Sequence, residues 1–275
     1  MLSCMYKLIV SDMDGTLLNG GHEVSAETEE ALRAAKARGV KVVLSTGRPY
    51  AGLGQYKERL RGLVDYTASY NGALVEDVAT GKLYKNNFLD YGALEYLYQL
   101  SLDLDVGMHF CDEANIYTPN RSVRHATMLD AVLNETPLHV RDVDEIAGDA
   151  RFPKILFAGD KAELDRVTVE LPKEVYEKFT VVRSADIFLE FIHLETSKGT
   201  ALEQILALEG LDATQAIAFG DNENDISMLK LAGMGVAMEN ATEQVKAVAD
   251  YVTGTNEAHG VAQAIERFVL KKEII

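Results

Sequence analysis

The chain has 275 residues, of which 47% are hydrophobic and 25% charged, a composition typical of a globular protein with a large core and one or two domains. Its formal net charge of −16 argues against nucleic acid or an anionic membrane as a main partner, and no apolar stretch is long enough to cross a bilayer. Residues 1–7 do not resemble a secretory signal, and Cys4 and Cys111 are too few for a disulfide framework, so we expect a cytoplasmic protein.

The first predicted strand leads directly into two carboxylates. Leu8–Val10 is an apolar run without polar alternation, which indicates a fully buried strand. Asp12 and Asp14 follow it, and residues two apart in extended chain point the same way, so both can address one site. Gly15 permits a sharp turn after them. Taken alone, this stretch is also compatible with an ordinary acidic turn.

The next segments form a strand–helix–strand unit. Ser25 is placed to cap a helix that has acidic residues in its first turn, basic residues in its last turn, and Gly39 at its end. A strand over 40–44 follows, and Pro49 suits the start of another helix. Such a unit predicts parallel strands joined by a right-handed crossover. A third strand over 66–69 and a hairpin over 73–86 come next.

The pattern changes in the middle of the chain and then returns. We interpret 89–195 as an inserted α+β domain, and 1–88 with 196–275 as one discontinuous core. The predicted helices are 91–104, 122–134, 162–171, 200–208, 226–231, 242–248 and 261–269, and the predicted strands are 106–111, 115–118, 155–158, 180–183, 188–192, 216–219 and 235–238.

Two basic residues stand where a helix is predicted to begin. Lys198 and Arg48 both oppose the helix dipole there, at a cost of about 0.3–1 kcal/mol each. Helix amino ends with basic side chains are suited to binding an anion, whereas a single such lysine is also compatible with a solvated surface residue. Two in one core favour an anion site, which an acidic chain needs in order to bind a phosphorylated metabolite.

A second group of carboxylates follows the strand over 216–219. Asp221 ends that strand, and Asn224 and Asp225 precede an apolar helix, where one of them is also expected to act as a cap. Carboxylates that converge on one sheet edge need a counter-charge, and Mg²⁺ with waters and a phosphate supplies it. The six histidines form no zinc-binding pattern.

Taken together, DMDGT, STGR, SKG and GDNEND, in this order and with an insertion after the second, resemble the haloacid dehalogenase superfamily. The chain is most similar to its Cof-type branch (subfamily IIB), and within it to the YidA-like sugar phosphatases. The resemblance covers nearly the whole length, including Tyr70–Ala73 and Gly235–Ala241. It implies a Rossmann-like three-layer α/β core with a parallel sheet, and an inserted α+β cap of the C2B type.

The resemblance also implies a role for each motif residue. Asp12 would be the nucleophile that forms an aspartyl-phosphate, and Asp14 the general acid and base. The phosphoryl oxygens would be held by Met13, Thr46, Gly47, Lys198 and Asn224, and Mg²⁺ by Asp12, the backbone carbonyl of Asp14, and Asp221, with Asp225 in support. Arg48 is implied only to lie near the site.

Substrate specificity is expected to reside in the cap. Candidate substrate contacts are Arg183, Ser184 and Glu190, although surface salt bridges are an equally good explanation of these charges. His259 stands where relatives often have an acidic residue. Residues 191–196, which precede Lys198, also differ from the sequence that is usual in this family.

These observations predict a Mg²⁺-dependent phosphatase of small phosphorylated metabolites, with sugar phosphates as the expected substrates. A phosphomutase would use the same nucleophile. A phospho-acceptor or ligand-binding module is the alternative from another class, and the long insertion argues against it. A dehalogenase would leave Asp14 and the metal ligands without a purpose.

Overall fold

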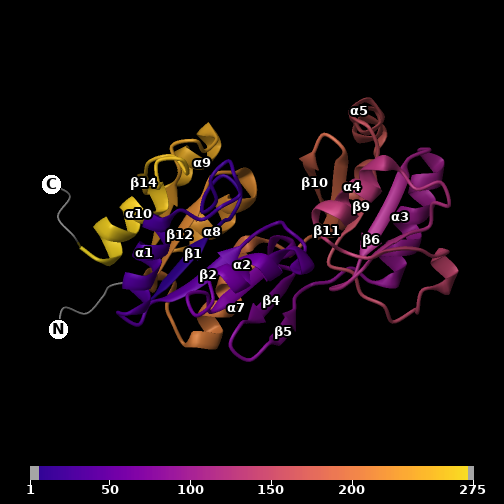
Figure 1. Ribbon diagram of the computed structural model, residues 1–275. Helices are drawn as coiled ribbons and strands as arrows, with labels where there is room; N and C mark the ends of the chain where they lie inside the picture. Colours follow the sequence, from indigo (N-terminus) through magenta and orange to yellow (C-terminus); the bar gives the residue numbers. More distant parts are fainter. Residues whose placement is uncertain (1–5, 272–275) are drawn as a thin grey trace. The chain divides into compact units, whose positions relative to one another are not determined.

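The computed structural model describes residues 6–271, which divide into two compact units (Figure 1). The first unit comprises the described parts of Met1–Gly47, Gln55–Tyr84 and Ser197–Ile275, and the second comprises Arg48–Gly54 and Lys85–Thr196. Cys4 lies outside the described residues. Within them, the structure contains no helix with both the length and the apolar character that a membrane crossing requires.

A predominantly parallel sheet forms the centre of the first unit. Its strands run parallel from β14 through β3, and β4 then pairs antiparallel with β3. The strand order is β14 (Tyr251–Val252), β13 (Met234–Ala237), β12 (Ala216–Gly220), β1 (Leu8–Ser11), β2 (Lys41–Ser45), β3 (Tyr66–Ser69), β4 (Leu74–Asp77) and β5 (Lys82–Lys85).

Helices cover this sheet, and the direction of their connections locates its functional edge. The connection through α1 (Ala26–Lys36) leads from β1 outward to β2, whereas the connection through α8 (Ile226–Leu231) leads from β12 in the opposite direction to β13. Right-handed crossovers in opposite directions place their helices on opposite faces and open a crevice at the carboxyl ends of β1 and β12. The helices are α1 (Ala26–Lys36), α2 (Gly54–Arg59), α7 (Lys198–Glu209), α8 (Ile226–Leu231), α9 (Glu243–Val248) and α10 (Gly260–Ala264), which a π-helical turn over Ile265–Val269 continues.

The central strand β1 is buried as its sequence predicts. Leu8, Ile9 and Val10 are almost completely inaccessible because neighbouring strands pair with β1 on both edges and helices cover both faces. Asp12 continues the ladder for one more residue, since its N–H donates to the Phe219 carbonyl over 3.0 Å. The first carboxylate is therefore attached directly to the buried central strand of the sheet.

The second unit is built on a mostly antiparallel sheet. An apolar core fills one side, where α3 (Tyr91–Asp103) and α5 (Lys161–Glu170) contribute Leu94, Leu97 and Leu164. The strand order is β10 (Phe179–Ala185), β11 (Phe188–His193), β9 (Ile155–Ala158), β6 (Gly107–Cys111), β7 (Ile116–Thr118) and β8 (Leu138–Val140), with helices α3 (Tyr91–Asp103), α4 (His125–Leu133), α5 (Lys161–Glu170) and α6 (Lys173–Lys178).

Polar side chains occupy the other face of this sheet. The strand register places His109, Leu156 and Glu190 side by side across β6, β9 and β11, so their side chains point to one face. His109 contacts α4 there, with Nε2 3.0 Å from Asp130 Oδ2 and Nδ1 3.1 Å from Thr127 Oγ1. Lys154 donates to Glu190 over 2.8 Å, and both side chains are buried.

The predicted fold class, an α/β core with an inserted α+β domain, is confirmed, and the differences lie in short or terminal segments. β8, β14 and α6 were not predicted, because two or three residues carry little periodicity and α6 is only six residues long. The helix predicted over 122–134 begins at His125, since Arg124 is extended and serves as its N-cap residue. Pro49 precedes a 3₁₀ turn over Tyr50–Leu53 instead of occupying the first turn of an α-helix.

The buried His109–Asp130 contact generates a pH-dependent prediction. Burial alone would raise the pKa of Asp130, but the His109 hydrogen bond and the nearby Lys154 charge outweigh it and lower this pKa. A carboxyl whose pKa is lower in the folded state stabilises above its unfolded pKa of about 3.9, and this stabilisation disappears as the pH falls through the folded value.

We therefore expect Asp130→Asn to lower the protection of β6 and β9 amides at pH 7 by about 1–3 kcal/mol in hydrogen exchange. The difference should shrink below about pH 4. The matched control is Asp105→Asn, at an exposed position of the same unit. An equal loss of protection at pH 7 and at pH 3 would contradict this account.

Candidate active site

A buried lysine connects two distant parts of the first unit. Lys198 Nζ lies 2.5 Å from Asp12 Oδ1 and 2.5 Å from Asp225 Oδ1, and the lysine side chain is 0% exposed. Ser197 caps α7, so Lys198 is the first residue of that helix and extends from its amino end. The placement that costs energy in an isolated helix is thus stabilised here by two carboxylates.

Asp225 also organises the loop around it. Its Oδ2 accepts hydrogen bonds from the backbone N–H groups of Asp221, over 2.9 Å, and Asn222, over 3.0 Å. Asp225 is therefore the third residue of a capping box at the 3₁₀ turn Glu223–Asp225, in addition to its ion pair with Lys198, and its side chain makes none of the expected capping hydrogen bonds to α8. Thr16 Oγ1 donates to Asp221 Oδ1 over 2.6 Å, which ties the turn after β1 to the loop after β12.

Three carboxylates are close enough to share a metal ion. Ligand atoms of Asp12, Asp221 and Asp225 lie within 4.8 Å of one another. Three negative charges against the one positive charge of Lys198 leave an excess of negative charge, and the donors are hard oxygen atoms. This donor set fits Mg²⁺.

Burial and charge shift the pKa values of this cluster. Burial raises the pKa of Asp12 well above its usual range, and Lys198 only partly offsets it while Asp225 and Asp221 add to it. Burial also raises the pKa of Asp221, partly offset by the Thr16 hydrogen bond. Burial disfavours the ammonium form of Lys198, but Asp12 and Asp225 outweigh it and raise the lysine pKa, so Lys198 is a cation at neutral pH.

Two glycines make the close approach of these carboxylates sterically possible. Gly15 has φ +79°, and a Cβ there would lie 2.5 Å from Asp221 Oδ2. A Cβ at Gly220 would lie 2.4 Å from the Asp225 Cβ. A side chain at either position would displace a carboxylate of the cluster.

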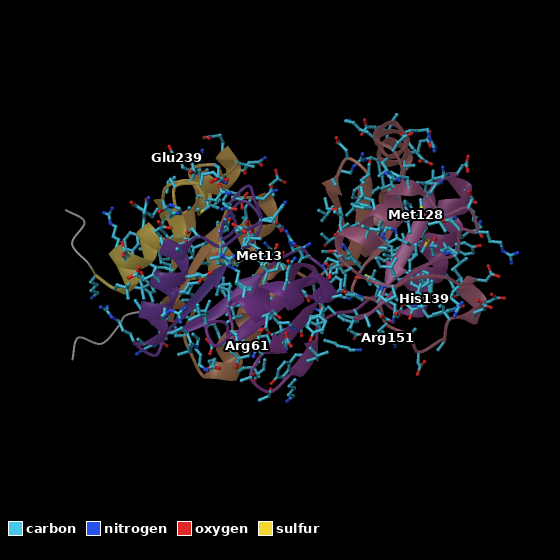
Figure 2. The ribbon with its side chains drawn as sticks, in the orientation of Figure 1. Met13, Arg61, Met128, His139, Arg151 and Glu239 are labelled. Carbon is cyan, nitrogen blue, oxygen red and sulfur yellow. The ribbon has the colours of Figure 1, made fainter. Side chains whose placement is uncertain are left out.

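The other predicted core residues lie on segments around this cluster. Asp14 is on the turn after β1 with its side chain 45% exposed, and its Oδ1 is 3.5 Å from His22 Nδ1. Met13, which stands between Asp12 and Asp14 in the sequence and is labelled in Figure 2, is fully buried. Thr46 and Gly47 follow β2, and Asn224 follows β12. Strands β1, β2 and β12 are adjacent and parallel, so all of these residues lie at one sheet edge.

Two asparagines without a predicted role hold the turn after β1. Asn240 Nδ2 donates to the Gly15 carbonyl over 2.7 Å, and Asn256 Nδ2 donates to the Leu18 carbonyl over 2.8 Å. The Asn256 N–H in turn donates to Asn240 Oδ1 over 3.0 Å. Asn240 lies within Gly235–Ala241, which was part of the family resemblance, but no local pattern indicates contacts this distant in sequence.

The substrate candidates of the second unit separate into two environments. Arg183 forms an ion pair with Asp165 over 3.4 Å and donates to the Ala185 carbonyl, as expected for a surface salt bridge. Ser184 donates to Glu190 Oε1 over 2.9 Å, and the same oxygen accepts from the buried Lys154. No local sequence pattern distinguishes Lys154 from a surface lysine.

Arg48 and His259 were singled out in the sequence without an assigned role. Arg48 belongs to the second unit, so its proximity to the site stays a prediction. His259 lies in the first unit at the start of α10, where its Nε2 is 3.7 Å from Glu27 Oε2 of α1.

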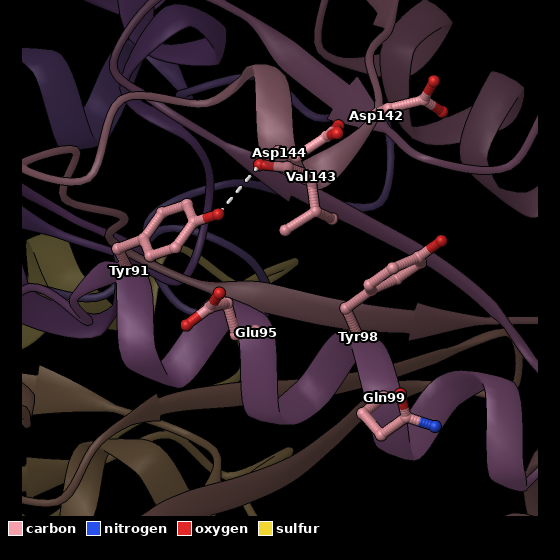
Figure 3. Close-up of a pocket in the computed structure, with 7 residues that line it drawn as sticks. All are labelled: Tyr91, Glu95, Tyr98, Gln99, Asp142, Val143 and Asp144. Atoms are coloured by element: carbon pink, nitrogen blue, oxygen red, sulfur yellow. Dashed lines mark hydrogen bonds between the residues drawn. The ribbon is translucent and has the colours of Figure 1, made fainter.

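The second unit also contains an open pocket of about 490 Å³ (Figure 3). Three carboxylates and two tyrosines contribute to its lining, and none of the predicted site residues does. Glu95, Asp142 and Asp144 would repel a phosphate monoester, which excludes this pocket as the phosphate site.

Comparisons with known proteins relate this chain to a family of hydrolases. Residues 9–265 match the family of haloacid dehalogenase-like hydrolases. The chain is 46% identical over 270 residues to YxeH of Bacillus subtilis (strain 168), an alignment that covers 98% of this chain and 100% of YxeH. A solved haloacid dehalogenase-like hydrolase from Bacteroides thetaiotaomicron is 36% identical with a TM-score of 0.84, covering 95% of this chain and 99% of that one. The subclass IIB sugar phosphatase BT4131 is 27% identical with a TM-score of 0.78, covering 95% and 98%.

Removing the shared cation should destabilise the first unit. We expect Lys198→Met to leave Asp12 and Asp225 as buried, uncompensated charges, and to lower the protection of β1 and β12 amides by about 3–5 kcal/mol at pH 7 without divalent cations. Native-state hydrogen exchange measures this loss. Lys230→Met, at an exposed position of α8, should change it by less than about 0.5 kcal/mol. Equal protection in the wild type and Lys198→Met would contradict the ion-pair account.

Proposed function

This chain belongs to the haloacid dehalogenase-like hydrolases and is a Cof-type phosphatase, and on that premise we propose that it hydrolyses small phosphorylated metabolites, sugar phosphates among them, through an aspartyl-phosphate on Asp12. The observation that carries this proposal is the position of Lys198, whose ammonium group lies 2.5 Å from Asp12 and from Asp225. A carboxylate held beside a cation can approach an anionic phosphate.

The first proposed step transfers the phosphoryl group to the protein. Asp12 attacks phosphorus, the bond from phosphorus to the leaving oxygen breaks, and Asp14 donates a proton to that oxygen. The exposure of Asp14 supports this role, because a proton donor must reach the leaving group, and its side chain is 45% exposed compared with 9% for that of Asp12.

The second proposed step restores the enzyme. Asp14 accepts a proton from water, the water oxygen attacks phosphorus, and the bond to Asp12 breaks to release orthophosphate. Phosphoryl transfer depends mainly on positioning and charge stabilisation. We assign these tasks to the Lys198 ammonium, Thr46, Asn224 and the backbone of Met13 and Gly47.

The carboxylates of Asp12, Asp221 and Asp225, with Asp14 through its backbone carbonyl, are the proposed Mg²⁺ ligands. Their oxygen donors and excess negative charge support this assignment. When bound, Mg²⁺ neutralises charge on the phosphoryl oxygens and on Asp12.

The substrate class rests on the similarity to the sugar phosphatase BT4131 and on the acidic surface, which gives no basis for a nucleic-acid substrate. The second unit is the proposed specificity domain, with Ser184, Glu190 and Arg183 as candidate contacts.

A panel of phosphorylated metabolites, assayed for released orthophosphate with Mg²⁺, tests the proposal. Catalytic release from a sugar phosphate is the expected result. An isomerised sugar phosphate would identify a phosphomutase, and stoichiometric phosphorylation without turnover would identify a phospho-acceptor module. Either outcome would overturn the proposed phosphatase.

Removal of the nucleophile should abolish turnover while the fold persists. We expect Asp12→Asn to reduce kcat by at least about 10³-fold, because an amide cannot form the phosphoenzyme. The fold should remain because the carbonyl oxygen of the introduced amide can still accept from Lys198, and Asp225 keeps its ion pair. Steady-state kinetics and circular dichroism check the two expectations. Substantial residual turnover in this variant would exclude the covalent route.

Mg²⁺ binding can be measured without substrate. A ligand at 100 times its dissociation constant stabilises a protein by about 2.7 kcal/mol, so Mg²⁺ should raise the Tm of the wild type. Asp221→Asn should lose most of this shift, whereas Glu203→Gln on an exposed part of α7 should keep it. EDTA should also remove turnover. An equal Mg²⁺-dependent Tm shift in wild type and Asp221→Asn would overturn the ligand assignment.

A further inference from the structure

The turn after β3 has an unusual backbone. Tyr70, Asn71 and Gly72 all have positive φ, at 51°, 56° and 100°. Glycine adopts this region freely and asparagine tolerates it better than most residues, but it remains costly for tyrosine. All three residues are buried, so the turn is held by its surroundings. Strain that the surrounding structure maintains is a reason to look for a function.

Asn71 connects two of the segments proposed to bind phosphate. Its backbone N–H donates to the Thr46 carbonyl over 2.9 Å. Its side-chain Oδ1 accepts from Asn224 Nδ2, also over 2.9 Å. A Cβ at Gly47 would lie 3.2 Å from the same Oδ1, so the Asn71 amide packs directly against the Gly47 backbone.

The neighbouring glycine connects the turn to the third segment. A Cβ at Gly72 would lie 2.4 Å from the backbone oxygen of Ser197, the residue that caps α7 immediately before Lys198. The turn therefore contacts the segments that carry Thr46, Asn224 and Lys198, although it contributes none of these residues itself.

We infer that Asn71 is a positioning residue, whose side chain orients the Asn224 amide toward a phosphoryl group. Asn224 is exposed on a short 3₁₀ turn, where an unrestrained side chain would sample several rotamers. Donation to Asn71 uses one of the two Nδ2 hydrogens, so the other is available in a fixed direction for a phosphoryl oxygen. This inference rests on the proposed phosphatase function.

The main test variant is Asn71→Gly, because glycine accepts the positive φ and removes only the side chain. Loss of orientation should lower both kcat/KM and the affinity for orthophosphate in the presence of Mg²⁺ by roughly tenfold. Asp105→Gly is the matched control, because Asp105 is an exposed residue of the second unit with φ 47°. It should leave both quantities unchanged.

A double-mutant cycle separates positioning from a merely structural role. If Asn71 acts through Asn224, then Asn71→Gly should cost less than about twofold in an Asn224→Ala background. Independent, multiplying effects of the two substitutions would overturn the inference. So would an Asn71→Gly protein within twofold of wild type in both measurements.

Asn71→Asp keeps the test decisive if the glycine variant fails to fold. Aspartate tolerates the left-handed region and retains the acceptor for Asn224, but it places a negative charge beside the anion. Orthophosphate affinity, measured by calorimetry on the full chain, should fall at least tenfold. Unchanged affinity would overturn the inference.

Measurements of turnover and of orthophosphate affinity together distinguish this inference from the proposed function. Wild-type turnover with no effect of Asn71 would refute the positioning role alone. Orthophosphate binding that depends on Asn71 and Asn224, without turnover of any phosphate ester, would refute the phosphatase proposal alone.

Discussion

The ion pairs of Lys198 with Asp12 and Asp225 are the interaction on which the first unit depends. Neither carboxylate is tolerable in the core alone, because an unpaired buried charge costs several kcal/mol. The lysine compensates for both, and it occupies the first position of α7, where the helix dipole disfavours it. The resulting arrangement is stable, yet it retains an excess of negative charge that a divalent cation can neutralise.

The topology of the sheet explains why these groups meet. β1 and β12 are neighbours whose connections run in opposite directions, and the residues after both strands therefore border one crevice. The turn at Tyr70–Gly72 also borders this crevice, because it contacts both Gly47 and the amino end of α7. A long insertion between β5 and α7 is compatible with this arrangement, since the local contacts around Lys198 do not depend on the length of the intervening chain.

The sheet of the second unit has two faces of different chemical character. One face of its sheet carries an ordinary apolar core, and the other carries charged groups that are paired with one another, notably Lys154 with Glu190 and His109 with Asp130. Such pairing maintains polar side chains on a sheet without the cost of unsatisfied groups.

The sequence by itself determined the α/β class, the long strands and helices, and the phosphatase family, because apolar periodicity and four motifs in series are local properties of the chain. Only the tertiary structure decided that Glu190 faces Lys154, since this contact depends on the register of β11 against β9. It likewise decided that Arg183 of β10 faces Asp165, since this contact depends on the packing of α5. It also decided the partners of Asn71, Asn240 and Asn256. The amide side chain of each asparagine hydrogen-bonds to a residue that is far away in the sequence. In the sequence alone, Asn71–Gly72 after a strand indicates only a turn.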